Sequence, residues 1–114
     1  MFAVLIYSLI NMNHPKIDMT EGVRKARSGS TADVDFLMNI LSEHTSLPEC
    51  KMTDYLLGLV ETADGCNRIK YYLFNGNPVQ RNYAALYFKR KGNSRLLNEA
   101  VRKLCIDKVQ ASVK

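Results

Sequence analysis

Residues 76–92, with the sequence GNPVQRNYAALYFKRKG, constrain the fold more than any other stretch because they carry signals for both ends of one helix. Asn77 suits the N-cap, Pro78 suits the first helical position, and Gln80 completes a capping box. Gly92 suits the left-handed turn that ends a helix. Three cations precede it and suit the negative end of the helix dipole: Lys89, Arg90 and Lys91. The segment predicts a complete helix between Asn77 and Gly92.

The side chains of this helix predict how it packs. Four larger apolar residues recur at helical spacing and are expected to line one side: Val79, Tyr83, Leu86 and Tyr87. Ala84 and Ala85 are small, so the backbone of a neighbouring helix can approach closely at this point. We therefore expect a close helix–helix contact at the two alanines, with the tyrosines supplying buried area.

Similar start and stop signals divide the rest of the chain into helices. The expected segments are Asp18 to about Ser28, Ser30 to about His44, Ser46 to about residues 64–65, 66–75, 93–94 to about Leu104, and a short helix from Asp107. Residues 66–75 are rich in Ile, Tyr and Phe as a strand would be, but Ile69, Tyr72 and Leu73 keep helical spacing. The sequence thus predicts an all-α fold of about six helices.

A weak internal repeat relates these helices. Residues 51–73 align with residues 78–100 at a shift of 27 residues. The shift superposes Leu59 on Leu86, Gly65 on Gly92, Arg68 on Arg95, and Ile69 on Leu96. Each copy then consists of a longer helix, a glycine turn and a second helix, and a looser copy runs from Glu21 to about His44. Helical hairpins repeated at this period are typical of an α-solenoid, whose stacked pairs share one core.

One copy also resembles a known repeat family. Its features, in order, are Asn77-Pro78, Arg81, the pair Ala84 and Ala85, Gly92, and the pair Leu96 and Leu97. This pattern is similar to a HEAT-like repeat of the short bacterial, phycobilisome-lyase type; the good match covers residues 77–101, and the copy at 51–75 lacks the Asn-Pro and the alanine pair. The resemblance implies a short α-α superhelix in which Arg81 contacts an acid one repeat away, which is Asp54 at the 27-residue shift.

The charge of the chain is unevenly distributed. Residues 1–50 hold 4 Lys and Arg against 6 Asp and Glu, whereas residues 51–114 hold 12 against 5, within a net charge of +5. The cations gather in the last helix pairs: Arg68, Lys70, Arg81, Lys89, Arg90, Lys91, Arg95, Arg102 and Lys103. Candidate contacts for an anion or nucleic acid are Arg68, Lys70, Lys89, Arg90, Lys91 and Arg95. Solvated helix ends explain the same charges without a ligand.

No catalytic, cofactor or metal site is predicted. The three cysteines, Cys50, Cys66 and Cys105, lack metal-ligand spacing, so we expect reduced thiols in a cytoplasmic protein. His14 and His44 are isolated, with no second ligand three or four residues away. An enzyme or accessory lyase would need a pocket of converging polar groups that the sequence does not display.

The N-terminal sequence MFAVLIYSLI is apolar but is about half as long as a bilayer span, and it lacks the features of a signal peptide. It either covers part of the core or extends a chain that starts naturally at Met12. We treat residues 1–11 as an extension and residues 12–114 as one domain without membrane association.

Two functional hypotheses follow from the predicted stack. In the first, the protein is a non-catalytic interaction module that binds another protein through its concave surface. In the alternative, the basic edge of residues 68–103 binds nucleic acid through phosphate contacts. The apolar ends of a short solenoid also suggest a homodimer.

Overall fold

Seven helices make up residues 18–112, the part of the chain that the computed structural model describes, and no strand occurs among those residues. The helices are α2 (Met19–Ser28), α3 (Thr31–Met38), α4 (Leu47–Leu57), α5 (Ala63–Asn75), α6 (Pro78–Arg90), α7 (Ser94–Arg102) and α8 (Lys108–Ala111). The all-α prediction is confirmed, and so is the helical assignment of residues 66–75. The expected extension at residues 1–11 lies outside the described residues.

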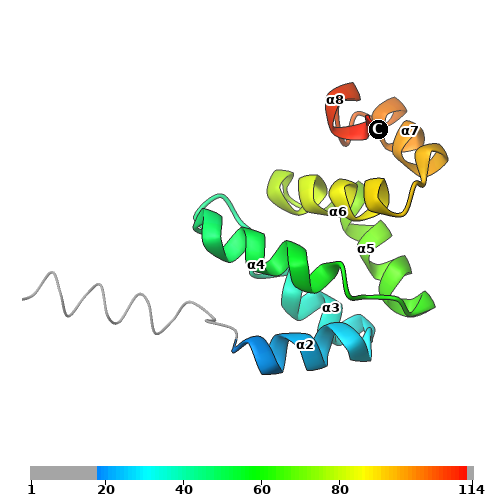
Figure 1. The fold of residues 1–114 in the computed structure, drawn as a ribbon. Helices are drawn as coiled ribbons and strands as arrows, with labels where there is room; N and C mark the ends of the chain where they lie inside the picture. The colour runs from blue at the N-terminus through cyan, green and yellow to red at the C-terminus, as the bar shows by residue number, and fades with distance from the viewer. Residues whose placement is uncertain (1–17, 113–114) are drawn as a thin grey trace, which may run out of the picture.

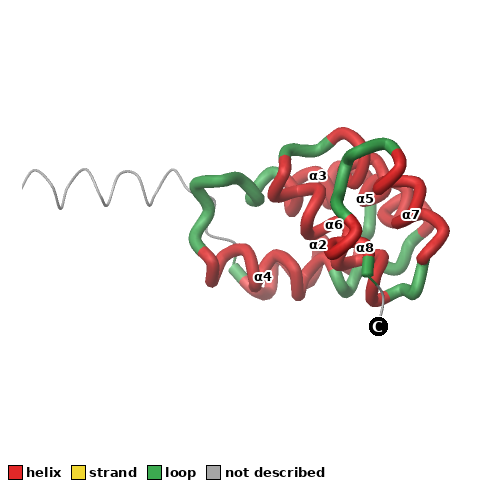
Figure 2. Tube along the Cα trace, turned by 90° about the horizontal axis from the view of Figure 1, so that it is seen from above, coloured by secondary structure: helices red, strands yellow, loops and turns green. Residues whose placement is uncertain are grey.

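The helices alternate between two layers as the chain rises from α2 to α8 (Figure 1). In one layer α2 packs against α4, α4 against α6, and α6 against α8, while α3 packs against α5 in the other. Each hairpin also packs against the start of the next, through α3 with α4, α5 with α6, and α7 with α8. The view from above shows the helices of successive hairpins overlapping (Figure 2). The result is an elongated stack of about 52 × 28 × 23 Å.

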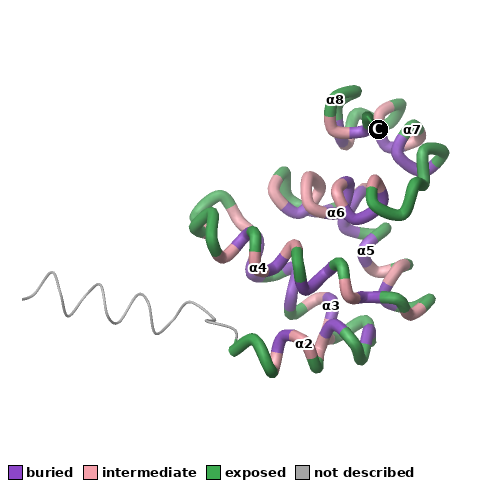
Figure 3. The backbone as a smooth tube through the Cα atoms, viewed as in Figure 1, coloured by how far each residue is buried: buried purple, intermediate pink, exposed green. Residues whose placement is uncertain are grey.

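One apolar core runs through the stack, with buried residues on every helix (Figure 3). The expected face of α3 and the loop after it is confirmed, since Val34, Leu37, Met38 and Leu41 are all buried. In α6 the two alanines are fully buried as expected, and Tyr87 is buried beside them. Val79, Tyr83 and Leu86 are only half-buried. Helix α6 therefore meets its neighbours with the two alanines together with the rings of Tyr87 and Phe88.

Three helix ends differ from the predicted ones. The helix capped by Ser30 ends at Met38 and not near His44, although Ile40 and Leu41 remain buried in the turns that follow it. The segment from Ser46 ends at Leu57, and a separate helix begins after Thr62. The apolar pattern continues into both turns because the turn residues still cover the core, so periodicity alone overestimates helix length.

The third difference concerns the end of α7. Leu104 was expected in this helix but follows it with φ +61°, and 89% of the residue is exposed. Its N–H bonds to Val101 O, and the N–H of Cys105 bonds to Ala100 O. These two bonds form a Schellman motif, in which glycine is the usual residue at the left-handed position. Gly92, after α6, adopts the left-handed conformation as predicted, with φ +71°.

The helix starts of the two central hairpins give a longer step than the predicted one. The N-caps Ser46 and Asn77 are 31 residues apart, and so are the N-caps Thr62 and Asn93. The predicted shift of 27 residues is therefore wrong. Gly65, which it placed in a turn, is a buried residue in the first turn of α5.

The starts of α5 and α6 also bind earlier parts of the chain. Their side chains donate hydrogen bonds to three backbone carbonyls: Thr62 Oγ1 to Gly29 (2.7 Å), Asn77 Nδ2 to Leu41 (3.0 Å), and Gln80 Nε2 to Met38 (2.9 Å). Met38 is the last residue of α3, and its carbonyl also accepts a bond from the N–H of Leu41 (3.0 Å), which lies in the turns after the helix. The capping residues therefore satisfy two helix ends at once and fix one hairpin upon another.

Candidate functional site

Arg68, the first residue of the predicted basic edge, is engaged in an ion pair between hairpins. Its Nε lies 2.6 Å from Asp35 Oδ1 on α3, and Tyr72 donates a hydrogen bond of 2.8 Å to the same carboxylate. Burial works to raise the pKa of Asp35, but the bonds from Arg68 and Tyr72 outweigh it and hold that pKa below its usual value. Burial and the carboxylate together raise the pKa of Tyr72 to about 12. Arg68 thus joins α5 to α3 and is not free for a ligand.

The predicted contact between Asp54 and Arg81 is wrong. Asp54 instead accepts two bonds from Arg90, at 3.0 and 3.2 Å, which tie α4 to the end of α6. Arg81 donates to the carbonyl of Gly76 at 2.8 Å, at the start of its own helix. The 31-residue step explains the difference, because it moves the acid of α4 away from the start of α6 and toward its C-terminal end.

Other residues of the predicted edge also have neighbours. Lys89 Nζ lies 3.4 Å from the carbonyl oxygen of Val109, and Lys91 Nζ lies 5.3 Å from the centre of the Tyr87 ring. Lys103 pairs with Glu99 at 3.3 Å. The edge is therefore not a continuous row of free charges. Arg68 and Arg95 do not occupy equivalent places either, since Arg68 lies in the second turn of α5 and Arg95 in the first turn of α7.

Five exposed cations of this region have no acidic partner among the described residues: Lys70, Lys91, Arg95, Arg102 and Lys108. Lys70 on α5 and Arg95 on α7 line the same groove of about 480 Å³, together with Asn67, Asn93 and Glu99. The structure thus brings together two of the six predicted contact residues. Lys108, which was not among the predicted contact residues, lies with Arg102 in a hollow between α7 and α8.

An exposed aromatic residue lies next to the groove that holds Lys70 and Arg95. Tyr71 is 45% exposed, and the Arg68 guanidinium lies 4.2 Å from the centre of its ring. Tyr72 meets the same ring edge-on at 5.4 Å. Asp35 holds Arg68 in place through its ion pair, and Arg68 in turn packs on the Tyr71 ring.

A second groove lies on the other layer, between α4 and the end of α6. It measures about 410 Å³ and is lined by Lys51, Asp54, Tyr55, Gly58, Leu59 and Arg90. A neighbouring hollow shares Gly58 and Leu59 and extends to Arg27 at the end of α2. Tyr55 is 57% exposed at its edge. Tyr55 was not among the predicted site residues, although its place beside the apolar positions of α4 indicates an aromatic residue at the border of the buried face.

The thiols and histidines do not form a reactive centre among the described residues. All three cysteines are free, and burial raises the pKa of Cys50. The Tyr87 hydroxyl donates a bond of 2.6 Å to the carbonyl of Val60 and lies 2.9 Å from Cys66 Sγ. Burial raises the pKa of Tyr87. This contact joins α5 and α6 inside the core.

His44 is exposed beside Glu43, and His14 lies outside the described residues. Within residues 18–112 no group of three or more His, Cys, Asp or Glu residues is placed to hold a metal ion. No helix of that part is long and apolar enough to cross a bilayer.

Comparison of the chain with models of known protein families, with curated proteins and with solved structures found no match.

Proposed function

We propose that the protein is a non-catalytic interaction module, a HEAT-like stack that binds another protein along the groove beside Tyr55. The observation that carries the proposal is an exposed aromatic residue next to an arginine fixed between two hairpins. Tyr55 projects from α4, and Arg90 is held by Asp54, the residue that precedes Tyr55 in the chain. Tyrosine and arginine are the residue types that most often dominate binding energy at protein interfaces.

The groove also has a shape and composition suited to a protein segment. It joins the ends of α2, α4 and α6, so a bound chain would cross three successive hairpins. Leu59 offers an apolar patch in the same groove as Lys51, which has no acidic partner among the described residues, so the groove suits an apolar segment that carries an acid. The Asp54–Arg90 pair orders Arg90 before binding, which reduces the entropy lost on association.

A comparison of three baits tests the proposal. The wild-type protein, Tyr55→Ala and Leu47→Ala are used to capture proteins from a lysate of the native host, and the captured proteins are quantified by mass spectrometry. Leu47 is the control because it lies on the same helix, is 61% exposed and lies outside the groove. We expect at least one protein to be retained by wild type and Leu47→Ala and lost from Tyr55→Ala. With that protein purified, Tyr55→Ala is expected to weaken binding by about 2 kcal/mol, roughly 30-fold. Identical sets on the three baits would remove the groove as the binding site.

A further inference from the structure

The second half of the chain has far more positive charge than its own acids can neutralise. Residues 65–114 contain 11 Lys and Arg and 2 Asp and Glu, whereas residues 1–64 contain 5 and 9. Of the two acids, Glu99 is paired with Lys103 and Asp107 caps α8. The cations that remain exposed in this region therefore need solvent ions or an external anion as counter-charge.

Two of those cations line one groove. Lys70 lines it from α5 and Arg95 from α7, and Asn67 and Asn93 add amide groups that can donate hydrogen bonds. Arg102 follows Arg95 by seven residues on the exposed side of α7, two helical turns or about 10 Å further along. The positive charge is thus spread in a line along α7 and is not gathered at one point, as suits a chain of phosphates better than a single small anion.

The aromatic residue at this groove is presented for stacking. Asn67 lines the groove, and Tyr71 lies one turn further along the same side of α5. Arg68 covers the Tyr71 ring from 4.2 Å, and its bidentate bond to Asp35 prevents it from acting as a free phosphate contact. The residue predicted to bind an anion therefore supports the aromatic ring instead.

We infer that the outer side of α5 and α7 binds single-stranded nucleic acid, with one base stacked on Tyr71 and neighbouring phosphates held by Lys70 and Arg95. Aromatic rings beside a positive groove bind unpaired bases without strong sequence preference. A duplex would keep its base faces covered by stacking and would offer Tyr71 nothing to bind. The inference does not rest on the groove beside Tyr55, which lies on the other layer.

Fluorescence anisotropy with labelled oligo-dT and oligo-rU of about 12 nucleotides tests the inference. Tyr71→Ala is expected to weaken binding about tenfold or more, and Tyr71→Phe, which keeps the ring, is expected to bind as wild type does. The double variant Lys70→Ala/Arg95→Ala is expected to weaken binding and to lower the slope of log K against log salt by about 1.4, because two phosphates are no longer neutralised by the protein. Circular dichroism checks that each variant keeps its helices.

The matched control is Arg27→Ala/Lys51→Ala, which has the same net charge as the double variant but lies on the other layer. It is expected to keep the wild-type affinity and salt slope. Equal losses in the two double variants would show attraction to the net charge alone and overturn the inference. Binding that is insensitive to Tyr71→Ala in a folded protein, or equal affinity for a duplex of the same length, would overturn it as well.

Discussion

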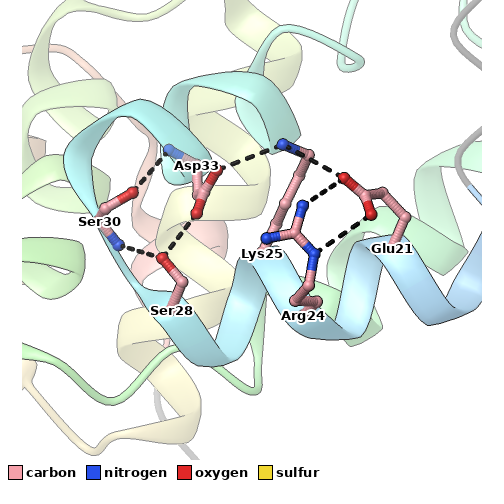
Figure 4. Close-up of polar contacts among 6 residues, drawn as sticks. All are labelled: Glu21, Arg24, Lys25, Ser28, Ser30 and Asp33. Atoms are coloured by element: carbon pink, nitrogen blue, oxygen red, sulfur yellow. Dashed lines mark hydrogen bonds and ion pairs between the residues drawn. The ribbon is translucent and has the colours of Figure 1, made fainter.

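Helices α2 and α7 differ in how many of their cations are paired with acids: two of the three cations of α2 are paired, and neither cation of α7 is. On α2, Arg24 lies 2.5 Å from Glu21, and Lys25 lies 3.3 Å from Asp33, whose other oxygen accepts a bond from Ser28 (Figure 4). On α7, neither Arg95 nor Arg102 forms an ion pair among the described residues, and Glu99, one turn after Arg95, pairs with Lys103 instead. The two helices are of similar length and both carry two or more cations. The difference lies in the acids nearby.

The same contrast holds for the turns. Gly29, after α2, is buried against Thr62 of a later hairpin, whereas Gly92, before α7, has open space around it. The first hairpin is fixed by polar contacts on several sides, while the last exposes Leu104 and Val109. In this stack, the polar groups of the first hairpin are used in contacts within the protein. The last hairpin leaves charged and apolar side chains exposed, where other molecules can bind them.

The largest expected effect compares the two glycines. Gly29 and Gly92 both have positive φ, so alanine at either position costs about 1 kcal/mol in backbone strain. At Gly29 the new Cβ would lie 2.2 Å from Thr62 Oγ1 and would displace both the cap of α5 and its bond to the Gly29 carbonyl. We expect Gly29→Ala to lower the free energy of unfolding by about 3 kcal/mol and Gly92→Ala by about 1 kcal/mol. Urea denaturation measures both, and equal losses would contradict the contrast between the ends.

The next effect compares one ion pair from each half. Asp35→Ala removes the acceptor of Arg68 and Tyr72, which are both partly withdrawn from water, and is expected to cost about 2 kcal/mol. Glu99→Ala removes an exposed pair within one helix and is expected to cost about 0.5 kcal/mol or less. The comparison is made by thermal and urea unfolding at neutral pH and low salt. A loss for Glu99→Ala as large as that for Asp35→Ala would show that exposure does not separate the two pairs.

A smaller effect is expected from acid. Burial opposes ionisation of Asp35, but its bonds to Arg68 and Tyr72 leave its pKa below the ordinary 3.8, and the Ser28 bond lowers the pKa of Asp33 likewise. A carboxylate with a depressed folded-state pKa stabilises the fold above its unfolded pKa, and this stability is lost as pH falls through the folded pKa. We therefore expect stability to decline below about pH 4, and Asp35→Asn to show a shallower decline than wild type. Parallel curves for the two proteins between about pH 5 and pH 2.5 would assign the acid sensitivity to other groups.

The smallest effect is a gain. Leu104 occupies a left-handed position after α7 and buries almost none of its side chain, so glycine relieves strain at little loss of packing. Leu104→Gly is expected to raise the free energy of unfolding by about 0.5 kcal/mol. Sedimentation velocity on the wild type and on the same variant tests the expected homodimer. If Leu104 contributes to the dimer interface, the variant should shift from dimer toward monomer. If Leu104→Gly instead lowers the free energy of unfolding of a monomeric protein, the Leu104 side chain contributes packing within the monomer, and the expected gain is contradicted.

The sequence predicts helix starts better than helix ends. Asp18, Ser30, Ser46, Asn77, Asn93 and Asp107 all cap helices as expected, because a capping side chain bonds to the backbone two or three residues away. Thr62 was missed because Leu59 and Val60 extend the apolar pattern across the turn before it. The helix ends depend on where buried turns cover the core, which a local pattern does not specify.

The candidate sites were only partly predictable for a related reason. Composition identified a basic second half, and the groove does contain Lys70 and Arg95. Which cations remain free depends on contacts such as Arg68 with Asp35 and Arg90 with Asp54, which join residues 33 and 36 positions apart. An error of a few residues in the repeat step is enough to exchange those partners, as the misplaced contact of Arg81 shows.

The bonds from Thr62, Asn77 and Gln80 to earlier carbonyls all run in the same direction, from a later donor to an older acceptor. A ribosome releases the N-terminal hairpin first, so each acceptor is in place before its donor is synthesised. Each new hairpin can thus pack against a hairpin that has already been synthesised. A chain deprived of residues 18–41 would have to form the later helices with these three donors left without their acceptors.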